Sequence, residues 1–146
     1  MQRKYGLDAL APLYAEALRH IRNAPGRIHA IFWLTRYARK DRRVVDAAIH
    51  CLNDRSRIVR KEACGILAYV LDREHIPRLR PLLEHRDSKT RAHAAAAIDA
   101  IEHRNHHFFL DREHSGSVFW YPDPREHSEA VARRIAKGSD LLDEDV

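Results

Sequence analysis

Residues 76–101 read IPRLRPLLEHRDSKTRAHAAAAIDAI, and this stretch decides the fold. Its second half places apolar or small residues at the spacing of a helix that packs on one face, at Thr90, Ala94, Ala97, Ile98 and Ile101. Asp87 precedes this set, and aspartate is a favoured helix N-cap. The stretch therefore predicts a first helix that carries Pro77, a turn, and a second helix.

The same pattern occurs 31 residues earlier in the chain. The segment RIVRKEACGILAYVLD carries the equivalent set, at Val59, Ala63, Ile66, Leu67 and Val70. The shift also relates the preceding helices, since Val45 and Leu52 stand 31 residues before Ile76 and Leu83. Two helix pairs related by one shift indicate an α-solenoid, in which each pair buries its apolar face by stacking on its neighbours.

The first part of the chain fits a degenerate version of the same unit. Residues 7–40 contain helical patterns broken at Asn23, Pro25 and Gly26, and they are more aromatic than the later units. We therefore predict an all-α fold, a short α-solenoid of about three helix pairs at residues 7–40, 41–72 and 73–103. Residues 1–103 would form the repeat region.

Residues 104–146 form a different, non-repetitive region. Two aromatic clusters, at residues 108–109 and 119–121, flank a polar loop with Gly116. A β-hairpin or an extended lid over the open end of the last repeat both fit this pattern. A short helix and an acidic, disordered end would follow. The region is therefore predicted to be a C-terminal aromatic cap with a tail, and its aromatic residues fit either a structural cap or a contact surface.

Residues 76–101 resemble a HEAT repeat of the short bacterial kind. The segment LNDRSRIVRKEACGILAYV at residues 52–70 is similar, and the resemblance covers about residues 41–103. In that family an aspartate and an arginine form a ladder between successive repeats. The resemblance implies this structural role for Arg60, Asp87 and Arg91. Ser56 stands where the ladder aspartate is expected in the earlier repeat, although Asp54 is close enough to replace it.

Composition limits the class of protein. No run approaches the roughly 18 apolar residues of a membrane span, and the N-terminus lacks the apolar stretch of a signal peptide. We therefore expect a cytoplasmic protein without a membrane partner.

Charge is distributed unevenly along the chain. Residues 1–110 carry 21 Lys and Arg against 12 Asp and Glu, whereas residues 111–146 carry 5 against 9. The repeat region is basic and the C-terminal region acidic, a pattern that fits either an anionic partner or a tail that folds back on the basic body and screens it.

The chain contains 11 histidines, five of them in Glu-His dipeptides. A HEAT-like family of diiron hydroxylases binds metal through pairs in the opposite order, His-Glu, so the resemblance to those enzymes is poor. The histidines nearest to a ligand set, His103, His106 and His107, also fit a polar turn after a helix. We expect no metal, no cofactor and no catalysis, since no nucleophile motif is present. A metal-dependent HEAT-like enzyme is the second alternative.

A nucleic-acid partner is the first alternative. A dense basic run crosses one inter-helix turn, at Arg36, Arg39, Lys40, Arg42 and Arg43. A HEAT-like class of alkylpurine DNA glycosylases uses a basic concave surface, but the site residues of that class have no counterparts here. Helical arginines also commonly pair with nearby carboxylates.

A protein partner fits the aromatic residues best. The inner face of the second helices carries Lys61, Tyr69 and His93, and the C-terminal region adds Trp120 and Tyr121. Tryptophan and tyrosine contribute strongly to interface energies. Very short HEAT-like proteins with aromatic tails resemble the immunity proteins of bacterial polymorphic toxins, which mask a toxin in a one-to-one complex. We therefore expect a non-catalytic protein-binding module of this kind.

Overall fold

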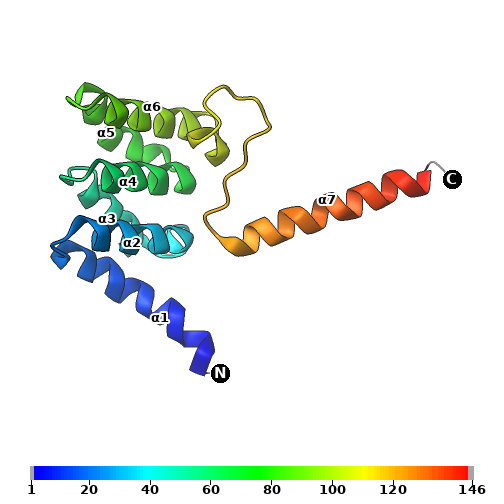
Figure 1. Cartoon of the computed structure of the whole chain (residues 1–146), viewed down its shortest axis with the longest axis horizontal. Coiled ribbons are helices and arrows are strands. Elements are labelled where there is room, and N and C mark those ends of the chain that lie inside the picture. The colour runs from blue at the N-terminus through cyan, green and yellow to red at the C-terminus, as the bar shows by residue number, and fades with distance from the viewer. Residues whose placement is uncertain (1, 145–146) are drawn as a thin grey trace.

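The computed structural model describes residues 2–144, with side chains for residues 10–138. Within this range the chain is all helical and has no strand. Figure 1 shows the first six α-helices stacked in layers and the last one leaving the stack. The helices are α1 (Gln2–Ala17), α2 (Ala24–Leu34), α3 (Arg42–Cys51), α4 (Arg57–Val70), α5 (Ile76–Leu79), α6 (Ser88–Glu102) and α7 (Pro124–Glu144).

The second helix of each pair begins at a capping side chain. Asn23, Ser56 and Asp87 accept hydrogen bonds from the backbone N–H groups of Gly26, Val59 and Thr90, respectively. Such caps satisfy N–H groups that have no partner within the helix. The first helix of the third pair is short, since Pro81 follows α5 and the chain continues as a 3-10 turn, Arg80–Glu84. The predicted all-α solenoid is confirmed.

One continuous core runs through the stack. Its fully buried residues come from both helices of the pairs and include Ile31, Leu34, Val44, Ile66, Leu79 and Ile101. The two cysteines are also buried, and burial raises the pKa of each thiol to about 12. Cys51 and Cys64 are therefore neutral packing residues.

Arginine residues link successive repeats at the turn between the two helices of each pair. The Arg27 guanidinium donates to both oxygens of Asp54 in the next repeat, at 2.8 and 3.0 Å. Arg60 repeats this contact one unit later, donating to Thr90 Oγ1 at 3.0 Å and to Asp87 at 3.4 Å. Arg60 and Asp87 therefore lie in the predicted ladder, and Asp54 replaces the aspartate missing at position 56.

Arg91 is the last of the three equivalent arginines, after Arg27 and Arg60. Its guanidinium donates to the carbonyls of His85 and Arg86 in its own repeat, at 2.6 and 3.2 Å. Arg60 makes the equivalent pair of bonds to the carbonyls of residues 54 and 55, and its remaining N–H groups reach the following repeat. Among residues 2–144 no further repeat follows α6, and the bonds of Arg91 stay within its own repeat, unlike those predicted for it. Arg27, which the sequence did not single out, ties two repeats.

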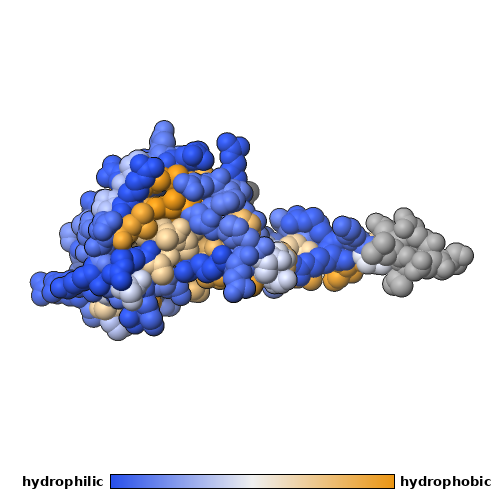
Figure 2. Space-filling view, turned by 90° about the horizontal axis from the view of Figure 1, so that it is seen from above, coloured by the Kyte–Doolittle hydropathy of each residue, from blue (hydrophilic) through white to orange (hydrophobic). Residues whose placement is uncertain are grey.

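The segment after α6 runs alongside the repeats. It forms a 3-10 turn, His106–Phe109, and then an irregular stretch that passes α4 and reaches the start of α7. We call residues 106–123 the strap. Since the strap contains no strand, the hairpin alternative is wrong. Figure 2 views the molecule from the α6 end and shows an area of apolar surface on that side. Leu83 and Ile98, in the last repeat, are only partly buried.

The C-terminal helix is longer than predicted. α7 spans 21 residues, and it leaves Val131 and Ile135 exposed. The predicted disordered end includes residues 145–146, which lie outside the described residues. Among the described residues, no helix combines the length and apolarity of a bilayer span.

Candidate partner-binding surface

The strap packs on the inner face of α4 at a residue without a side chain. A Cβ atom placed on Gly65 would lie 3.1 Å from the Phe109 ring and 3.4 Å from the Trp120 ring. Both distances are short for a contact of a Cβ atom, so the two rings pack directly against the backbone of α4. Gly65 is therefore covered by the protein's own C-terminal segment.

Tyr69 lies beneath the same segment and is 1% exposed. Its ring packs under the Arg39 guanidinium, at 3.8 Å, and edge-on to Trp120. Its hydroxyl donates to Glu126 Oε1 at 2.6 Å, and burial and then this bond raise the pKa of Tyr69. Tyr69 therefore holds the start of α7 and the strap in place. In this structure it is not available as the partner anchor that the sequence predicted.

Two adjacent histidines bind the backbone of Trp120. His106 Nε2 donates to the Trp120 carbonyl, and the Trp120 N–H donates to His107 Nδ1, both at 2.9 Å. Arg39 lies 3.3 Å from His106 Nδ1 and donates to it, which requires that nitrogen to be unprotonated. Burial lowers the pKa of His106 to about 4 and lowers that of His107. Both rings are therefore neutral at pH 7.

We expect acid to loosen this arrangement. Burial also lowers the pKa of His93 to about 4. The unfolded chain therefore binds more protons than the folded chain between pH 6.5 and 4, so stability is full above pH 6.5 and falls as the pH drops toward 4. Because His93 and His106 are partly exposed, we expect a loss of about 2 kcal/mol at most. Urea unfolding at pH 7 and pH 4.5 measures it, and His106→Gln should show a smaller drop.

A groove opens where the strap meets α2 and α4. It has a volume of about 430 Å³. We call it the aromatic groove, and its lining consists of Phe32, Thr35, Arg36, Glu62, Trp120, Tyr121, Pro122 and Pro124. Burial raises the pKa of Glu62. An aromatic and proline lining with few polar groups is typical of a surface that receives an apolar side chain from a partner.

The fold places the predicted binding residues in different surroundings, and only two of them line the aromatic groove. Trp120 and Tyr121 line the aromatic groove, and Lys61 is half-buried on α4. His93 lies against the Phe109 ring, and its Nδ1 is buried without a hydrogen-bond partner in the described part of the chain. The sequence missed Phe32, which is 63% exposed at the groove. The sequence shows that residue 32 is aromatic. It does not show the path of the strap, which brings Trp120 into the same groove as Phe32.

The basic run between α2 and α3 is largely paired within the protein. Arg39 bonds Glu126 and the Tyr69 carbonyl, Arg42 bonds Asp46, and Arg43 bonds Asp41. Other basic residues gather at a cavity of about 660 Å³ near the first two repeats, which Asp54 also lines. Its basic lining residues are Arg19, His20, Arg22, Arg27, His50 and Arg55. The cavity, rather than the basic run, is the place where an anionic ligand would meet an excess of positive charge.

Sequence comparison agrees with this architecture over the central part of the chain. Residues 45–106, from α3 to the start of the strap, match the family model of HEAT repeats. Comparison with curated proteins and with solved structures gave no match.

Proposed function

Since residues 45–106 are HEAT repeats, we propose that this protein is a non-catalytic module that binds another protein through the aromatic groove. HEAT repeats commonly mediate contacts between proteins and are typically scaffolds without catalytic activity. A fold alone does not fix a function, so the proposal depends on the groove.

The exposure of aromatic side chains around the groove supports the proposal most directly. Phe32 is 63% exposed and Phe119 46% exposed, beside half-buried Trp120 and Tyr121. Exposed apolar side chains that gather around a depression are a mark of interaction sites. Arg36 and Tyr121 add residue types that are enriched among interface hot spots.

Charge favours an acidic partner. Residues 1–110, which include the whole repeat region, carry 21 Lys and Arg against 12 Asp and Glu, a net charge of +9. Opposite charge on a partner would speed association. We propose the resemblance to toxin-immunity proteins as the specific form of this function, in which one copy masks one acidic toxin domain in the cytoplasm.

A photo-crosslinking experiment tests the site while the partner is still unidentified. A benzoylphenylalanine placed at position 32 should crosslink one protein in cells of the native host. The same group at position 13 is the matched control, because Leu13 and Phe32 are 65% and 63% exposed. Crosslinks to one protein from position 32 alone support the proposal. Equal crosslinking from both positions, or crosslinks to nucleic acid, would contradict it.

With the partner identified, Phe32→Ala and Tyr121→Ala should each weaken binding by about 2 kcal/mol, roughly thirtyfold, because each removes an aromatic group from the groove. Isothermal titration calorimetry measures the affinity, and Leu13→Ala serves as control. Lys61→Glu should mainly slow association and change its salt dependence.

A nucleic-acid partner predicts a different pattern. Arg22→Ala and Arg55→Ala in the basic cavity would then weaken binding additively and flatten its salt dependence, whereas Tyr121→Ala would have little effect. This alternative would replace the proposed function if that pattern were observed.

A further inference from the structure

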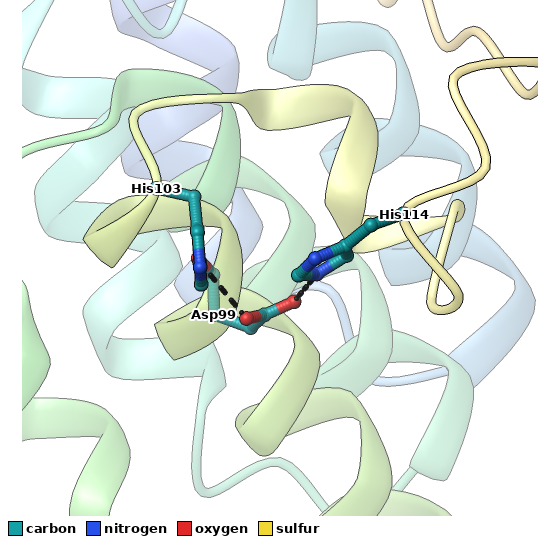
Figure 3. A group of neighbouring side chains, drawn as sticks. All are labelled: Asp99, His103 and His114. Atoms are coloured by element: carbon teal, nitrogen blue, oxygen red, sulfur yellow. Dashed lines mark hydrogen bonds and ion pairs between the residues drawn. The ribbon is translucent and has the colours of Figure 1, made fainter.

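Three potential metal ligands meet where the strap crosses the end of α6. Figure 3 shows Asp99 between two imidazoles, one from each segment. His103 Nδ1 lies 3.0 Å from Asp99 Oδ1, and His114 Nε2 lies 2.5 Å from Asp99 Oδ2. The ligand atoms of the three residues all lie within 4.8 Å of one another. The two segments therefore bring together one carboxylate and two imidazoles.

Asp99 and His103 are placed by the end of α6. Asp99 lies in the last turn of the helix, and His103 is its C-cap, four residues later. Residues four apart at a helix end lie on the same side, and this spacing is also found between ligands in zinc sites. The helix and its C-cap thus supply two ligands, and the third must come from elsewhere in the fold.

His114 is held in position by the strap itself. Asp111, which is 3% exposed, accepts hydrogen bonds from the Ser115 and Gly116 N–H groups and from the Ser115 hydroxyl. The His114 backbone is left-handed, with φ of 55°, a conformation uncommon for residues other than glycine. The His114 ring stacks on Phe108 at 3.8 Å. These contacts fix the loop so that the imidazole faces Asp99.

We propose that Asp99, His103 and His114 form a binding site for a divalent transition-metal ion, with zinc as the reference ion. Zinc bonds histidine nitrogen and carboxylate oxygen at about 2.0–2.2 Å in a tetrahedron, which separates neighbouring ligand atoms by about 3.4 Å. Here the three side chains are hydrogen-bonded to one another at 3.0 and 2.5 Å, and His103 Nδ1 also donates to the Asp99 carbonyl at 2.9 Å. Binding an ion therefore replaces these hydrogen bonds, and side-chain rotations that widen the separations bring the ligand atoms around it. Two imidazoles favour zinc over magnesium or calcium. Water takes the fourth position.

The site replaces the sequence-based expectation that no metal binds. Of the candidate ligand set His103, His106 and His107, only His103 belongs to it, because His106 and His107 bind the Trp120 backbone. His114 is one of the Glu-His histidines of the sequence, and Asp99 was not predicted. The bound ion ties the strap to α6, which makes its role structural and independent of the partner proposed for the aromatic groove.

Titration of the full-length, untagged, chelator-treated protein with zinc chloride tests the site. Calorimetry should give one ion per chain with a dissociation constant of about 1 μM or lower. Asp99→Asn and His114→Ala should each weaken binding by at least thirtyfold, while His50→Gln, on α3, leaves it unchanged. No saturable binding at 100 μM zinc, or equal loss in the His50→Gln control, would overturn the proposal and leave a hydrogen-bonded cluster.

A ligand exchange separates loss of a metal ligand from loss of the fold. His114→Cys replaces an imidazole with a thiolate, which zinc and cobalt also bind. The cobalt-loaded variant should show thiolate-to-cobalt charge-transfer absorption that the unsubstituted protein lacks. Circular dichroism of the metal-free variants should match the unsubstituted protein. A folded His114→Cys variant without this absorption would contradict the assignment of His114.

Discussion

Replacing Arg60 with alanine should lower the free energy of unfolding by about 3–4 kcal/mol. The Arg60 side chain is 9% exposed and donates to Thr90, to Asp87 and to the carbonyls of residues 54 and 55. Alanine removes the donor from the Thr90 hydroxyl and from the two carbonyls in a place that water reaches poorly, while Asp87 keeps its bonds from Thr90. Urea denaturation followed by circular dichroism measures the effect.

Two variants control for charge and for position in the series. Arg60→Lys keeps the charge but loses the planar guanidinium with its several N–H donors, so it should still lower the free energy of unfolding by about 2 kcal/mol. Arg91→Ala removes an exposed arginine that bonds only its own turn, and should cost less than about 1 kcal/mol. Equal losses for Arg60→Ala and Arg91→Ala would show that the link between repeats adds nothing to stability.

Replacing Phe109 with alanine should cost about 3 kcal/mol and detach the strap from α4. The ring is 3% exposed and packs between Gly65, Trp120 and His93. Its removal leaves a cavity of the kind that costs about 3–5 kcal/mol in a rigid core. The lower value applies here because the strap is able to move into the space. Thermal unfolding gives the stability, and hydrogen exchange in residues 106–123 reports the detachment.

Phe119→Ala is the matched control for this experiment. Phe119 lies on the same strap but is 46% exposed, so its removal should cost less than about 1 kcal/mol and leave exchange at the strap unchanged. If Phe109→Ala and Phe119→Ala had the same effect on exchange, the contact with Gly65 would not be what holds the strap.

The repeat region was readable from the sequence because its signals are local. Apolar spacing, Asp87 as a cap and the 31-residue shift each depend on residues within one or two helices. The ladder was predicted in part. Arg60 has a following repeat and Arg91 does not, a difference that depends on where the stack ends and not on the local residues.

The candidate sites could not be predicted in full, because they depend on the path of the strap, which has no periodic sequence pattern. The strap has no regular secondary structure between residues 110 and 123, and its course is set by the contacts of Phe109, Trp120 and the two histidines. The sequence identified Trp120 and Tyr121 as aromatic residues of interest. It also placed Tyr69 on the inner face, but the strap that buries Tyr69 lies about 50 residues further along the chain.

Arg91 bonds the carbonyls of its own repeat through Nη1, and among residues 2–144 no following repeat supplies an aspartate to it, so the α6 end is a natural point of extension by duplication. In both complete links, the arginine precedes its aspartate by 27 residues. A second copy of residues 73–103, inserted after residue 103, would place its aspartate at that same separation from Arg91. The lengthened chain would then gain another arginine–aspartate link between repeats, for which the original chain already supplies the arginine. This is expected if arrays of this kind grow by internal copying of a single unit.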